Sequence, residues 1–167
     1  MSKTKHPTYT TFYRVMLILS TIGTSLGTLG LLSLPELLDS REHAPLYATC
    51  ALIMHVVTLV SIAALVMLWQ KKQLGYLLKL STYAVLIIVC IVSLFGVDAY
   101  SQYSVDLALN QLASEGFSDT QMEQITRTVV PFFIKASVVL GIIQAVVFAI
   151  LWRAAWKKQL AYDKENA

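Results

Sequence analysis

Four long runs of apolar residues dominate this sequence. They cover approximately residues 12–34, 46–69, 76–97 and 132–152, and most charged residues lie in the gaps between them. Each run has the roughly 20 residues that a helix needs to cross a hydrocarbon layer about 30 Å thick. The chain has too few polar residues to cover four such helices with a soluble shell, because 56% of its residues are hydrophobic and only 14% are charged. The sequence therefore predicts an all-α integral membrane protein, with a four-transmembrane-helix bundle as a single membrane domain over residues 1–167.

Lysines and arginines are distributed unevenly about these runs. Ten of the 13 fall on one predicted side of the bundle, and only Arg41, Arg127 and Lys135 fall on the other. An excess of Lys and Arg marks the cytoplasmic side. We therefore expect the tails, residues 1–11 and 153–167, to be cytoplasmic, with Lys79 among the inside charges at the inner end of the third run. A bacterial inner membrane is the expected location.

The segment 98–131, between the third and fourth runs, is too long to be structureless in a compact protein. Val105, Leu109 and Leu112 share one helical face in its first half. A second apolar stripe contains Met122, Ile125 and Val129. We therefore expect an amphipathic helical hairpin on the outer face, with its second arm running into the fourth span and bending at Pro131. Two interpretations stay open, a structural cap and a lid that docks a partner.

Polar side chains inside the runs are few, and they define a candidate ligand site. His55 lies near mid-depth in the second run and Gln144 near mid-depth in the fourth, while Thr24 and Thr28 belong to the hydroxyl-rich middle of the first run. An ionisable residue at this depth is a functional hypothesis by default because it is costly to insert. The alternative for His55 is a structural hydrogen bond to a neighbouring helix.

One ion pair is expected near the outer ends of two spans. Lys135 lies one turn inside the fourth run, where its side chain can extend to the interface. Asp98, at the end of the third run, lies at similar depth and is its expected partner. The pair is interpreted as structural.

Small residues form a candidate helix-packing face on the first run. Its members are Ser20, Gly23, Gly27 and Gly30. Small side chains let helix backbones approach closely in lipid, where no hydrophobic force drives helices together. The face either packs against other spans of this chain or meets another subunit.

Several enzymatic chemistries are excluded by the residues that they would need. The two cysteines, Cys50 and Cys90, lie within predicted spans and form neither a reactive outer-loop pair nor a metal-binding spacing. Every acidic residue lies at or beyond the span ends. We therefore predict no catalytic residue, no metal and no cofactor, and the chain has no feature of a nucleic-acid-binding protein.

The sequence favours a small non-enzymatic membrane protein. In this interpretation it is an accessory or assembly subunit of a membrane complex, or a self-associating bundle, which meets a membrane-protein partner or a second copy through the first span or the outer hairpin. Two alternatives remain. One is a small carrier, channel or lipid- or ligand-binding protein with a polar site near mid-membrane. The other is an immunity protein that shields the membrane against a toxin.

Overall fold

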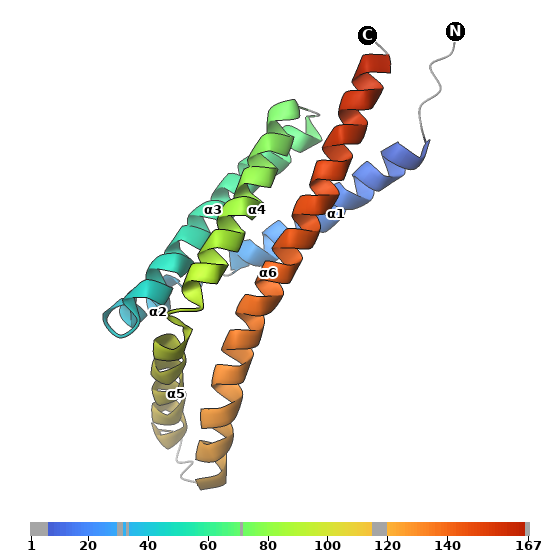
Figure 1. Cartoon of the computed structure of the whole chain (residues 1–167). Helices are drawn as coiled ribbons and strands as arrows, with labels where there is room; N and C mark the ends of the chain where they lie inside the picture. The colour runs from blue at the N-terminus through green and yellow to red at the C-terminus, as the bar shows by residue number, and fades with distance from the viewer. Residues whose placement is uncertain (1–6, 30–31, 33, 71, 115–119, 166–167) are drawn as a thin grey trace. The chain divides into compact units, whose positions relative to one another are not determined.

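The computed structural model of this chain describes residues 7–29, 32, 34–70, 72–114 and 120–165, which form helices separated by short turns and contain no strand. The elements are α1 (Pro7–Leu29), α2 (Leu34–Asp39), the 3-10 helix η2 (Ser40–Glu42), α3 (Pro45–Trp69), α4 (Gln73–Ser93), α5 (Val97–Ser114) and α6 (Thr120–Glu165) (Figure 1). The all-helical prediction is confirmed. Three helices of the described chain, α3, α4 and α6, are long and apolar enough to cross a membrane.

The first predicted span differs most from the structure. Helix α1 ends at Leu29, and Pro35 lies inside α2 instead of ending the span. Proline is well tolerated in the first turn of a helix, where its missing N–H has no intrahelical partner to lose. The apolar part of α1, Thr11–Leu26, is shorter than the length that marks a membrane-crossing helix.

Helices α3 and α4 form a hairpin whose close contact depends on a glycine (Figure 1). A Cβ atom at Gly75 would lie 2.8 Å from the backbone nitrogen of Leu68 and 3.1 Å from the carbonyl oxygen of Ala64. Only the absence of a side chain lets the two backbones approach this closely. Helix α4 begins three residues before the predicted boundary and ends at Ser93, and the predicted span end, Val97, instead begins α5.

Helix α6 contains both the second arm of the expected hairpin and the fourth apolar run, which the sequence analysis expected to be continuous. It has 46 residues and contains Pro131 in its interior, so the second arm of the predicted hairpin and the fourth apolar run are one helix. At 1.5 Å per residue it is about 69 Å long, about twice the hydrocarbon thickness of a bilayer. Residues 115–119, where the hairpin would turn, lie outside the described residues.

The chain divides into two compact units. Unit 1 comprises residues 1–32, 55–86 and 144–167, and unit 2 comprises residues 33–54 and 87–143. The divisions fall inside α3, α4 and α6. By sequence, unit 1 holds ten lysines and arginines and two acidic residues, a net charge of +8, whereas unit 2 holds three and eight, a net charge of −5. The two values sum to the +3 of the whole chain.

Unit 1 has an aromatic core. Trp152 and Tyr76 are almost completely buried, with their ring centroids 5.8 Å apart in an edge-on arrangement. The indole N–H of Trp152 donates to Ser20 Oγ at 3.0 Å, and the Tyr13 hydroxyl donates to the Leu68 carbonyl. These ring contacts and the two hydrogen bonds hold α1, α3, α4 and α6 together within unit 1.

Unit 2 is built around smaller contacts. Leu37, Ala48 and Ala51 form a buried cluster between α2 and α3. Tyr47 of α3 stacks on Tyr100 of α5, with centroids 4.0 Å apart. Gly96, in the turn before α5, lies so close to α3 that a Cβ atom there would be 3.0 Å from the Tyr47 backbone nitrogen. These contacts fix the first turns of α5 against the start of α3.

Candidate functional site

A buried lysine is the most unusual polar feature of unit 1. Lys79 lies on α4, in a helix apolar enough to span a membrane, and only 2% of it is exposed. Lysine is almost never fully buried unless its charge is compensated. The sequence analysis counted Lys79 as a charge near the inner membrane surface, and the structure instead encloses it among three helices.

Hydroxyl groups surround the Lys79 ammonium. Its Nζ atom donates to Ser61 Oγ on α3 and to Thr24 Oγ1 on α1, the latter at 3.3 Å. The two hydroxyl oxygens are 3.4 Å apart, and the Tyr83 ring centroid lies 5.3 Å from Nζ. An ammonium has three donors, so two hydroxyls and a ring face solvate it. We call Lys79, Thr24, Ser61 and Tyr83 the lysine cluster.

The lysine cluster contains dipoles but no anion. The ion pairs among the described residues are Arg127–Glu123 and Lys135–Asp98, and both belong to unit 2. The acidic residues in the sequence of unit 1 are Asp163 and Glu165, whose side chains lie outside the described part. Hydroxyl dipoles lower the cost of a buried charge but do not neutralise it. The described part of unit 1 therefore has an uncompensated positive charge inside its core.

Of the four predicted ligand residues, the structure brings Thr24 into the lysine cluster. Thr28 lies one turn further along α1, where its hydroxyl donates to the backbone carbonyls of Ser25 and Thr24. His55 is half-buried on α3, and Gln144 is exposed on α6. Thr24 is thus the one predicted ligand residue that lies in the lysine cluster. The central residues of this cluster, Lys79 and Ser61, were not among the predicted ligand residues.

Two of the four residues of the predicted packing face on α1, Ser20 and Gly23, have described surroundings. Ser20 is buried against Trp152, whereas Gly23 is exposed, and a Cβ atom there would meet nothing within 4 Å. Gly27 and Gly30 lie outside the residues whose surroundings are described. The described contacts of this chain therefore do not require glycine at position 23.

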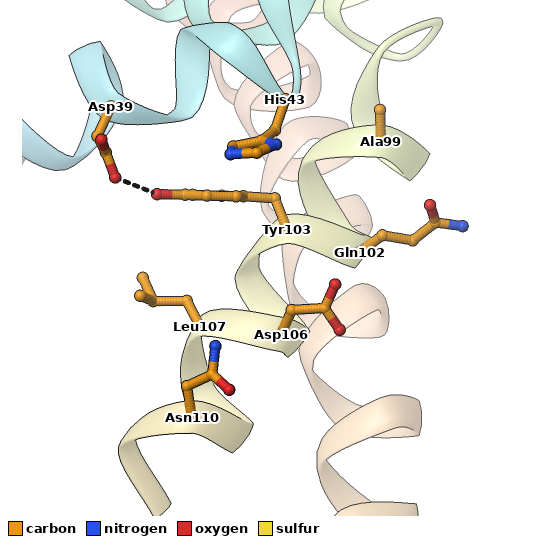
Figure 2. Close-up of a pocket in the computed structure, with 8 residues that line it drawn as sticks. All are labelled: Asp39, His43, Ala99, Gln102, Tyr103, Asp106, Leu107 and Asn110. Carbon is orange, nitrogen blue, oxygen red and sulfur yellow. Dashed lines mark hydrogen bonds between the residues drawn. The ribbon is translucent and has the colours of Figure 1, made fainter. Parts of the chain in front are cut away.

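A second candidate site is an open groove in unit 2, with a volume of about 450 Å³. Figure 2 shows it along one face of α5 and beside the end of η2. Helix α5 contributes Ala99, Gln102, Tyr103, Asp106, Leu107 and Asn110, and the segment around η2 contributes Asp39 and His43. We call this cavity the α5 groove.

Tyr103 is the central side chain of the α5 groove. Its hydroxyl donates to Asp39 Oδ2 at 2.8 Å, and the His43 ring stacks on it with centroids 5.1 Å apart. Leu107 and Asn110 lie on the opposite side of the ring from His43 (Figure 2). The hydrogen bond with the Asp39 carboxylate raises the pKa of Tyr103 above its ordinary value, because the bond stabilises the protonated hydroxyl and a tyrosinate would lie beside a negative charge.

Charged residues of α6 border this region. A neighbouring cavity of about 290 Å³ shares Gln102 and Asp106 with the α5 groove and is also lined by Arg127 and Pro131. The Arg127 side chain is paired with Glu123, one turn away, at 3.0 Å. Lys135 Nζ lies 2.7 Å from Asp98 Oδ1, so the structure contains the ion pair suggested by the sequence, at exposed positions.

No group of three His, Cys, Asp or Glu side chains within the described ranges is placed to hold a metal ion. Cys50 and Cys90 are free and buried, and the Cys90 sulfur lies 3.9 Å from that of Met54. No protein-family model, curated protein or solved structure matches the chain significantly. The lysine cluster and the α5 groove are therefore the two structural features that bear on the function of this chain.

Proposed function

We propose that this chain is a small, non-enzymatic integral membrane protein that acts as an accessory or assembly subunit, and that Lys79 pairs with an acidic residue on a transmembrane helix of its partner. The burial of Lys79 among hydroxyl groups carries this proposal. A charge inside a membrane protein is costly and is usually paired or placed in a functional pathway. The described part of unit 1 supplies no carboxylate to Lys79, so a partner is the proposed source of the counter-charge.

Helix α1 leaves room for a partner helix to approach the lysine cluster. Thr24, which accepts a hydrogen bond from Lys79, is only half-buried. One residue earlier, the space around Gly23 is open, which suits the close approach of another helix backbone. The partner would bring its carboxylate towards the Thr24 side of the lysine cluster and exchange a hydroxyl contact of Lys79 for an ion pair.

We further propose that α1 is the fourth span and that both termini are cytoplasmic, in a bacterial inner membrane. Helix α1 has 23 residues, about 34 Å of helix, which is long enough to cross a bilayer core even though its apolar part is limited to Thr11–Leu26. The ranges of unit 1 contain both termini and carry the +8 net charge, in agreement with the usual excess of positive residues on the cytoplasmic side.

The test is affinity purification of the tagged chain from native membranes in a mild detergent, followed by mass spectrometry. The wild-type chain should recover a membrane protein in stoichiometric amount, and Lys79→Met should lose it. Lys135→Met is the matched control, because it removes an exposed lysine with a visible partner. Recovery of the same partner by wild type and Lys79→Met, or of the wild-type chain alone, contradicts the proposal.

The folding of Lys79→Met must be checked separately. Methionine fills a volume close to that of the lysine stem, and Thr24 and Ser61 remain near enough to hydrogen-bond each other. Replacing a buried charged group by an apolar one is often neutral or stabilising. We therefore expect an unchanged or raised Tm for this variant, so that loss of the partner is not loss of the fold.

A second function is favoured by the same cluster, namely binding of an anionic lipid or other anionic ligand by a small carrier or binding protein. The contact of Thr24 with Lys79 supports this alternative, because the hydroxyls and the ammonium together form an anion-attracting group. Native mass spectrometry of the purified chain distinguishes the two. A bound anionic lipid that is lost in Lys79→Met, with no protein partner, would favour the ligand-binding function.

A further inference from the structure

We infer that the α5 groove binds a lysine or arginine side chain on a segment of a partner polypeptide. This inference concerns unit 2 alone and does not depend on Lys79 or on the function proposed above. It starts from the chemistry of the groove, which is lined by the Tyr103 ring and by the carboxylates of Asp39 and Asp106 (Figure 2).

The carboxylates provide charge complementarity to a cation. Asp39 and Asp106 are both exposed, and each lines the α5 groove. Asp39 uses one oxygen to accept the Tyr103 hydrogen bond, and a carboxylate has further lone pairs with which to accept others. The sequence of unit 2 carries eight acidic residues against three lysines and arginines, so its electrostatic field attracts a basic segment.

The Tyr103 ring adds a contact that a simple pair of acids lacks. His43 covers one face of this ring, and the other face is directed towards Leu107 and Asn110 (Figure 2). A cation over the face of a tyrosine is attracted by the ring quadrupole. The hydrogen bond from Tyr103 to Asp39 and the stacked His43 hold the ring in place, which lowers the entropic cost of forming this contact.

The shape of the groove favours a side chain of a polypeptide. The lining residues other than Tyr103 are exposed, so the groove is wide open and does not enclose a small molecule. Asp106 is also a neighbour of Arg127 in the adjoining cavity, but Arg127 is engaged by Glu123. Asp106 therefore remains available to an incoming ammonium or guanidinium group.

The experiment measures binding of a fluorescein-labelled hexalysine peptide to the full purified chain in a nonionic detergent, by fluorescence anisotropy. Asp39→Asn and Asp106→Asn should each weaken binding about fivefold, the size expected for one exposed charged contact. Glu42→Gln is the matched control. It removes the same charge from an exposed residue of unit 2 that does not line the groove and belongs to neither ion pair of the described residues, and it should change Kd less than about twofold. Equal weakening by all three variants would show non-specific attraction and overturn the inference.

A second pair of variants tests the aromatic contact. Tyr103→Phe keeps the ring and should leave Kd within about twofold, whereas Tyr103→Leu removes it and should weaken binding about threefold. Circular dichroism of each variant must match the wild type. Isothermal titration calorimetry with spermidine identifies the type of occupant, because binding of spermidine by a chain that does not bind hexalysine would mean a small polyamine and would overturn a polypeptide partner.

Discussion

At the scale of single residues, two glycines that look alike in sequence have opposite surroundings. A Cβ atom at Gly75 would press against the α3 backbone, whereas one at Gly23 would enter open space. We expect Gly75→Ala to lower the free energy of unfolding by about 1–3 kcal/mol because backbone atoms cannot move aside cheaply. Gly23→Ala should be neutral or stabilising by up to about 1 kcal/mol, from helix propensity alone.

Thermal unfolding in one detergent, monitored by circular dichroism, checks both glycine variants side by side. Loss of stability in Gly23→Ala would mean that this position is packed against something, such as a second copy of the chain. Dilution of the wild-type protein would then also lower its Tm, because an associated state depends on concentration.

Tyr103 provides a residue-scale prediction about pH. Its pKa is raised by the hydrogen bond to Asp39, so the interaction stabilises the fold below the ordinary tyrosine pKa near 10 and is lost as pH rises through the higher folded-state value. The contribution of Tyr103 to the absorbance at 295 nm is obtained by subtracting the absorbance of Tyr103→Phe from that of the wild type. This contribution should therefore titrate above pH 10. In an Asp39→Asn background the same difference should shift to lower pH, and an unchanged midpoint would show that Asp39 is not the cause.

Among single residues, the burial of Lys79 is the feature that the sequence analysis did not predict. Lys79 lies close to the predicted inner end of a span, and a lysine in such a position can usually extend its ammonium to the membrane surface. Whether it does so depends on Thr24 and Ser61, which are 55 and 18 residues away in the sequence. The hydroxyl of Ser61 within an apolar run was the available signal, but its pairing with Lys79 requires the tertiary structure.

At the scale of elements, apolar run length predicted the helices well and their ends less well. Helix α3 agrees with its predicted boundaries to within one residue at its start and at its end. The two ends of α4 differ from the predicted boundaries, and each has a glycine nearby that lies close to α3. Gly75 contacts Leu68 and Ala64, and Gly96 contacts Leu46 and Tyr47, and the hydropathy of a window does not contain such contacts. The groove beside α5 likewise needed Asp39 and Tyr103 to meet across 64 residues of sequence.

Helix α6 gives a prediction at this scale. Pro131 cannot donate a backbone hydrogen bond to the carbonyl one turn earlier, so it weakens a helix that otherwise continues through it. Pro131→Ala should raise the Tm, with a gain of up to about 3 kcal/mol. Gln124→Ala, an exposed change in the same helix, is the control and should be within about 0.5 kcal/mol of the wild type. A lower Tm for Pro131→Ala would mean that the proline ring has a packing role at the cavity that it lines.

At the scale of the whole molecule, the charge pattern and the contact pattern agree. The residues that the sequence analysis assigned to the inner side are the charged residues of unit 1, and those assigned to the outer side are the charged residues of unit 2. The division into two units was not predicted, because the sequence analysis treated residues 1–167 as a single membrane domain. Hydropathy and charge were not enough to identify a partner or ligand, because those depend on which few polar groups meet inside each unit.

The same agreement makes the membrane topology testable through single cysteines. With Cys50 and Cys90 replaced by alanine, a cysteine at Arg41 or Asn110 should react with a membrane-impermeant maleimide in intact cells. A cysteine at Lys72 or Lys157 should react only after permeabilisation, because the proposed topology places these Lys- and Arg-rich segments on the cytoplasmic side. All four positions are exposed, so accessibility of the side chain does not limit the reaction.

Different outcomes of this labelling separate the topology from the number of spans. If Lys72 and Lys157 label from outside and the other two do not, the orientation is reversed and the charge argument fails. If the cysteines at positions 41, 110 and 157 are labelled as expected, a cysteine in place of Arg14 shows whether α1 crosses the membrane. Labelling at position 14 only after permeabilisation supports a fourth span that brings Thr24 to Lys79 within the membrane. Labelling in intact cells would leave three spans, and the hydroxyl partners of Lys79 would then need another explanation.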